Sequence, residues 1–70
     1  MSFSDSIKLI RKKSLLSQDA FAKELGVSFT TVNRWERGKA KPTYKTLKRI
    51  DNYCKSKGLE IDISEIALED

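Results

Sequence analysis

Apolar positions in this chain recur three or four residues apart, which is the spacing of one face of an α-helix. Four such stretches follow one another, each with polar residues between the apolar positions. They predict helices over about residues 4–14, 17–25, 29–37 and 44–56. Phe3 precedes the first stretch and is expected to fold back onto it as a hydrophobic staple.

Residues that favour helix ends flank these stretches. Hydroxyl and carboxylate side chains accept hydrogen bonds at a helix start, whereas glycine adopts the left-handed conformation that closes a helix. Ser4 and Asp5 are expected to open the first helix. The expected N-caps of the next three helices are Ser17, Ser28 and Thr43, and the expected ends are Gly26, Gly38 and Gly58. Pro42 disfavours helix at the residue just before it.

The C-terminal segment is compatible with two structures. Leu59, Ile61 and Ile63 alternate with polar residues, as in a strand. Alternatively, residue 62 or 64 caps a short helix that carries Ile66 and Leu68, and we favour this interpretation. The whole chain, residues 1–70, is therefore expected to be one all-α domain, a compact bundle of four or five helices.

Charge is distributed unevenly over the 70 residues. The formal net charge is +4 and the pI is about 9.4. Residues 8–49 hold most of the lysines and arginines, whereas residues 60–70 hold five acidic residues and no basic one. A basic body indicates a polyanionic partner, with nucleic acid favoured over an anionic membrane. A solvated surface followed by an acidic tail explains the charge equally well.

Several classes of function are not expected. The chain has one cysteine, Cys54, and no histidine, so neither a metal site nor an internal disulfide nor a cofactor is expected. No apolar run approaches the roughly 20 residues of a membrane span, and no signal peptide is visible. The chain contains no paired carboxylates in a plausible pocket and no glycine-rich phosphate loop, so an enzyme is not expected. A reducing, cytoplasmic location follows as an expectation.

Two short helices joined through a glycine turn, residues 17–37, predict a helix-turn-helix. The second helix of such a motif lies in the DNA major groove. Val32 and Trp35 are its expected core residues. The opposite face carries Phe29, Thr30, Asn33 and Arg34. Arginine pairs well with guanine and asparagine with adenine, and threonine or phenylalanine can contact a thymine methyl group.

A set of motifs lies at regular places along the chain: Arg11, Leu16-Ser17-Gln18, Phe21-Ala22, Leu25-Gly26-Val27-Ser28, Val32, and Trp35-Glu36-Arg37-Gly38-Lys39 followed by Pro42. Together, over about residues 5–57, they resemble the phage-repressor-like helix-turn-helix family, the Cro and lambda-repressor or xenobiotic-response-element type. The resemblance implies a five-helix domain that binds double-stranded DNA, usually as a homodimer on a two-fold site.

The resemblance also implies roles for matching residues. Gln18 is expected to contact a phosphate and an adjacent base, and Phe29, Thr30 and Arg34 are expected to contact bases, with Asn33 a further candidate. The DNA-binding set is completed by residues near phosphates or at the start of the recognition helix: Ser28, Thr31, Arg37, Lys39 and Lys41. Arg11 and Glu36 are expected to form a structural ion pair.

Two features depart from the family pattern. Leu15 stands where the family often has glycine, so the first helix must end without a glycine or continue further. The segment after Gly58 also fits poorly, which leaves the dimer contact uncertain on sequence grounds.

The sequence thus predicts a sequence-specific DNA-binding transcriptional regulator, expected to act as a dimeric repressor. Its expected location is the cytoplasm, as a bacterial or phage protein associated with the nucleoid. The alternative is a protein-interaction or antitoxin-like module, or the DNA-targeting piece of a larger protein, that docks a partner through residues 59–70. An RNA-binding function is less favoured, because the A-form major groove is too deep and narrow for a helix to contact bases.

Overall fold

The computed structural model describes residues 2–61 and residue 63. In this part of the chain the structure consists of four helices and no strand. They are α1 (Phe3–Lys13), α2 (Gln18–Leu25), α3 (Phe29–Glu36) and α4 (Tyr44–Ser56). The all-α prediction is confirmed, and all four predicted helices are present. The predicted fifth helix falls almost entirely outside the described residues.

Three of the four helices begin at the predicted caps. The hydroxyl oxygens of Ser17, Ser28 and Thr43 each accept a hydrogen bond from the backbone N–H three residues further on. The predicted start of α1 was wrong, because its N-cap is Ser2. The earlier start places Phe3 inside the helix, where it is 5% exposed and packs edge-on against Trp35. The Ser2 Oγ accepts a hydrogen bond from the Asp5 backbone N–H at 3.2 Å, and this local cap explains the earlier start.

Directly after α1, a leucine adopts the left-handed backbone conformation that glycine usually takes at a helix end. Leu15 has φ 59°, close to the values of Gly26, Gly38 and Gly58 at the other helix ends. Its N–H donates to the carbonyl of Lys12 at 3.0 Å, so the helix closes and does not continue. A side chain in this conformation costs about 1–2 kcal/mol. Leu15 is 91% exposed, so it recovers little of that cost through packing.

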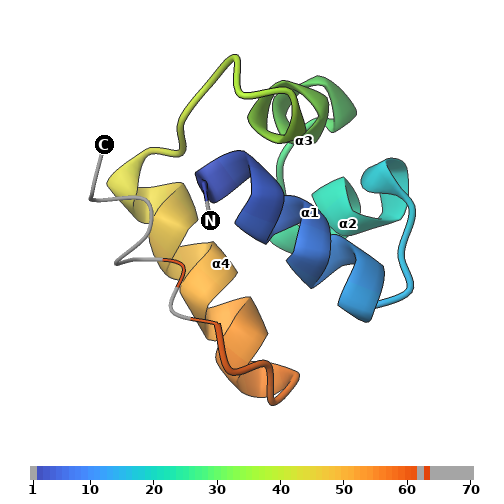
Figure 1. Ribbon diagram of the computed structural model, residues 1–70, viewed down its shortest axis with the longest axis vertical. Helices are drawn as coiled ribbons and strands as arrows, with labels where there is room; N and C mark the ends of the chain where they lie inside the picture. Colours follow the sequence, from blue (N-terminus) through green and yellow to red (C-terminus); the bar gives the residue numbers. More distant parts are fainter. Residues whose placement is uncertain (1, 62, 64–70) are drawn as a thin grey trace.

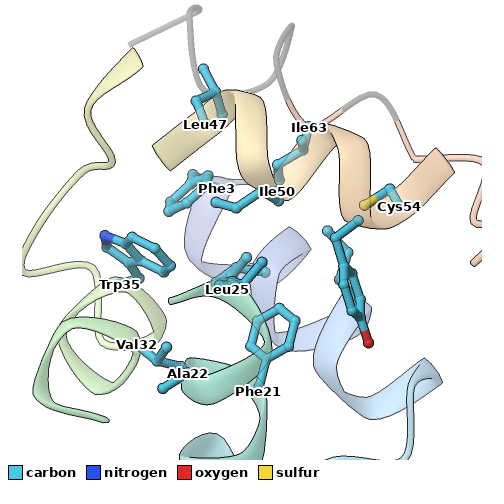
Figure 2. Close-up of a cluster of buried hydrophobic side chains, with 13 residues drawn as sticks. Phe3, Phe21, Ala22, Leu25, Val32, Trp35, Leu47, Ile50, Cys54 and Ile63 are labelled. Atoms are coloured by element: carbon cyan, nitrogen blue, oxygen red, sulfur yellow. The ribbon is translucent and has the colours of Figure 1, made fainter. Parts of the chain in front are cut away.

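The hydrophobic core combines side chains from all four helices. Figure 2 shows Phe3 of α1, Leu25 of α2, Trp35 of α3 and Ile50 of α4 converging on one cluster. Trp35 is 2% exposed, which confirms its predicted place in the core. Cys54 is also buried. Its burial and, to a lesser extent, the negative charge of Asp51 raise the pKa of its thiol.

The helices are arranged so that α3 has one side on the protein and one side in solvent. α3 packs against α1 and α2, and α2 also packs against α4. In Figure 1, α3 lies at the upper edge of the molecule, and residues 37–43 connect it to α4. After α4 the chain turns back towards the core, where Ile63 is fully buried. None of the described helices is both long and apolar enough to cross a membrane.

Candidate nucleic-acid interface

The side chains of α3 divide into an inward and an outward side. The inward side, made of Val32, Trp35 and Glu36, is buried against the other helices. The outward side, made of Phe29, Thr30 and Arg34, is exposed to solvent, as is Arg37 directly after the helix. Phe29 remains 48% exposed although it is large and apolar. The helical repeat produces this division, because residues three and four apart share a face.

The start of α3 is stabilised by two hydroxyl residues of the predicted DNA-binding set. The Ser28 Oγ accepts a hydrogen bond from the Thr31 backbone N–H at 3.1 Å, and the two hydroxyl oxygens lie 2.8 Å apart. These contacts hold the first turn of the helix. Ser28 is exposed and Thr31 is partly buried, so Ser28 is the more accessible of the two.

The loop after α3 brings basic side chains next to the outward side. The Lys39 backbone N–H donates to the Arg34 carbonyl at 2.8 Å, which folds the loop back onto the helix. In return, the Arg34 Nη2 lies 3.4 Å from the Lys39 carbonyl oxygen. Arg34 has five N–H donors, so this single long contact leaves most of its hydrogen-bonding capacity available. Arg37, Lys39 and Lys41 are exposed beside it.

The charged side chains of α3 and the following loop are mostly positive. Residues 29–43, which span α3 and the following loop, contain four lysines and arginines and one acidic residue, Glu36. Glu36 is 6% exposed and therefore does not neutralise the surface. The surface of α3 and of the following loop is consequently positive, as a phosphate backbone requires.

Glu36 is paired with Arg11 of α1. The Arg11 Nε donates to the Glu36 Oε2 at 2.6 Å, and the Arg11 Nη2 donates to the Glu36 Oε1 at 3.0 Å. The Arg11 Nη1 also donates to the Leu16 carbonyl at 3.0 Å. The guanidinium therefore links the end of α3 to the chain segment between α1 and α2.

The environment of this pair changes the pKa of both groups. Burial alone raises the pKa of Glu36, but hydrogen bonds from Arg11 and Gln18 and the charges of Arg11 and Lys8 outweigh it, so the pKa is lowered. The hydrogen bond to Glu36 raises the pKa of Arg11 against the effect of burial. Both shifts keep the pair charged at neutral pH.

Gln18 and Asn33 make contacts that the sequence did not predict. The Gln18 Nε2 donates to the Glu36 Oε1 at 3.1 Å, and the Gln18 Oε1 accepts from the Asn33 Nδ2 at 3.2 Å. Both residues are partly buried, Gln18 at the start of α2 and Asn33 in α3. Asn33 lies 15 positions after Gln18 and Glu36 lies 18 positions after it, so no helical repeat could have indicated the connection.

One groove lies away from α3. It has a volume of about 620 Å³ between the end of α2 and α4, where the Arg49 Nη1 lies 3.5 Å from the carbonyl oxygens of Leu25 and Gly26. Among residues 2–61 and 63, no group of three or more histidine, cysteine or acidic side chains could hold a metal ion.

A four-helix domain that exposes one side of a short helix behind a glycine turn, with a positive surface around it, is a helix-turn-helix domain. A model of the helix-turn-helix family matches residues 7–61, and the chain belongs to this family, in its phage-repressor-like branch. The family match and the relative described below support a DNA-binding transcription regulator.

A curated relative supports the same assignment. The chain is 33% identical over 66 residues to a protein of Enterococcus faecalis named HTH-type transcriptional activator BcrR. The match covers 94% of this chain and 30% of the relative, so the chain spans less than a third of the relative's length. No solved structure matches the chain.

Proposed function

We propose that this chain binds double-stranded DNA in a sequence-specific manner, with α3 in the major groove. The observation that carries the proposal is the exposure of Phe29, Thr30 and Arg34 on the outward side of α3. These residue types match the donors, acceptors and methyl groups that base edges present in the major groove. Arg34 is the expected contact to guanine, and Thr30 and Phe29 are expected to contact thymine methyl groups.

Phosphate contacts supply affinity in this proposal, and base contacts supply specificity. Arg37, Lys39 and Lys41 are the expected phosphate contacts, because they are exposed and lie at the end of α3 or in the following loop. Ser28 and Thr31 lie at the opposite end of the helix, where a phosphate could approach the helix start. Gln18 and Asn33 lie beside the outward side and complete the proposed interface.

We further propose a homodimer on a two-fold site. One recognition helix covers one half-site, so two copies are needed for useful affinity, with half-sites about one helical turn (~34 Å) apart. Occupancy of a promoter by such a dimer favours repression, in the cytoplasm of a bacterium or phage host. The relative is named an activator, so the sign of regulation must be measured for this chain.

The test is selection of bound sequences from a random duplex pool at two salt concentrations, with Arg34→Ala as the matched variant. A two-fold motif with half-sites about a turn apart supports the dimeric regulator. Enrichment of a single half-site supports sequence-specific binding but contradicts the proposed dimer. Binding without any enriched motif, lost at the higher salt concentration, means that the basic surface attracts DNA only non-specifically and overturns the proposal.

A further inference from the structure

The side chains of Glu36, Gln18 and Asn33 form a hydrogen-bond network from the core to the proposed DNA surface. Glu36 accepts from the Gln18 Nε2 at 3.1 Å, and the Gln18 Oε1 accepts from the Asn33 Nδ2 at 3.2 Å. Arg11 holds the other end of the network through two hydrogen bonds to Glu36. The network therefore starts at a fixed ion pair and ends at Asn33, next to Arg34 on α3.

The chemistry of Glu36 sets the direction of every hydrogen bond in this network. An ionised carboxylate can only accept hydrogen bonds, so the end of the Gln18 amide that faces it must be the NH₂ group. The oxygen of the same amide then faces Asn33. Two oxygens cannot hydrogen-bond to each other, so Asn33 must turn its own NH₂ group towards Gln18.

With this order of donors and acceptors, the Asn33 side-chain oxygen is the group directed away from Gln18. We infer that Glu36 and Gln18 orient the Asn33 amide so that its oxygen faces the DNA, which makes Asn33 select a base with an exocyclic amino group. Adenine and cytosine present such an amino group in the major groove, whereas guanine and thymine present acceptors. Every base pair carries one such amino group, but only adenine has an acceptor, its N7, on the same base, so the remaining N–H of Asn33 selects the A·T pair. The inference rests on the proposed function.

The orientation is held by several fixed groups and not by Asn33 alone. Glu36 has an exposed side-chain fraction of 4%, and Arg11 one of 16%. Reversal of the Asn33 amide would place its oxygen against the Gln18 oxygen and cost a hydrogen bond. Gln18 is thus a positioning residue, and its expected effect on base preference is indirect.

The test compares base preferences of the wild-type chain, Asn33→Ala, Gln18→Met and the double variant on the selected DNA site. Methionine keeps the length of the glutamine side chain but cannot donate a hydrogen bond. Arg34→Ala identifies the base pair that Arg34 contacts, and the preference at that base pair serves as the internal control. Melting temperatures verify that each variant is folded, and Gln18→Ala replaces Gln18→Met if the latter is not.

The expected result is a preference for an A·T base pair that Asn33→Ala weakens by about 5- to 100-fold at one position. Gln18→Met should weaken the preference at that same base pair, leave the Arg34 base pair unchanged, and add nothing in the double variant. A purely structural role of Gln18 would lower the melting temperature without this selective effect.

Other outcomes overturn the inference. They are a preference for a G·C base pair at the Asn33 position, no change on Asn33→Ala, a Gln18→Met variant that keeps the preference, or one that weakens binding equally on all sequences. If the wild-type chain enriches no motif at all, the proposed function fails and the inference fails with it. A clear motif that neither variant alters leaves the proposed function intact and removes only the inference.

Discussion

The two sides of α3 use the same eight residues for different purposes. The inward side places Val32 and Trp35 in the core and pairs Glu36 with Arg11. The outward side leaves Arg34 exposed, with only a long contact to the Lys39 carbonyl. Stability therefore depends on one side, and proposed DNA binding on the other. This difference predicts that substitutions on the two sides have separable effects.

The largest effect is expected for Glu36→Ala. It leaves the Arg11 guanidinium partly buried without its partner, which should lower the free energy of unfolding by about 3–5 kcal/mol. Urea or thermal unfolding measures this loss. Glu24→Ala, at an exposed position of α2, is the matched control and should change stability by less than about 0.5 kcal/mol. An unchanged melting temperature for Glu36→Ala would show that the pair is effectively solvated.

The same pair predicts a loss of stability in acid. The pKa of Glu36 is lowered in the folded protein, so the unfolded chain binds the proton at higher pH. The contribution of Glu36 is fully present above the ordinary pKa of 4.5 and is lost as the pH falls through the folded pKa. Unfolding free energies measured on both sides of that value test this.

The Glu36→Gln variant isolates the contribution of this carboxyl, since other acidic residues also titrate in the same range. It should show a weaker dependence of stability on pH than the wild-type chain. Identical pH profiles for the two proteins would contradict the assignment.

On the outward side, Arg34→Ala should leave the melting temperature unchanged but cost about 1–3 kcal/mol of binding free energy on the preferred DNA site. The reason is the loss of a bidentate base contact. Affinity for random DNA should change little. If affinity for both DNAs falls together, Arg34 contacts a phosphate instead of a base.

The smallest effect is expected for Lys39→Ala. Loss of one phosphate contact should weaken binding to all sequences alike and reduce the slope of log affinity against log salt by about 0.9. Lys55→Ala is a suitable control, because Lys55 lies near the end of α4 and pairs with Asp51 at 3.0 Å. A slope that Lys39→Ala leaves unchanged would remove Lys39 from the interface.

The sequence predicted those features whose causes lie within one helical turn. The spacing of Phe21 and Leu25 placed α2, and the hydroxyl of Ser28 followed by helical residues placed the start of α3. The spacing within α3 also separated Trp35 from Arg34 correctly. Each of these depends on residues one to four positions apart, which a pattern along the chain can show.

Features that connect distant parts of the chain were decided only by the tertiary structure. The contact of the Phe3 ring with Trp35 joins α1 to α3, far apart along the chain. The Arg11–Glu36 pair was expected from the family resemblance alone, whereas the hydrogen bonds of Gln18 to Glu36 and to Asn33, 18 and 15 positions away, were not expected. The sequence alone determined which helices form and which side of each is apolar, because these follow from local spacing. Which polar side chains meet, and in which orientation, depends on how the helices pack, and a local pattern carries no information about that packing.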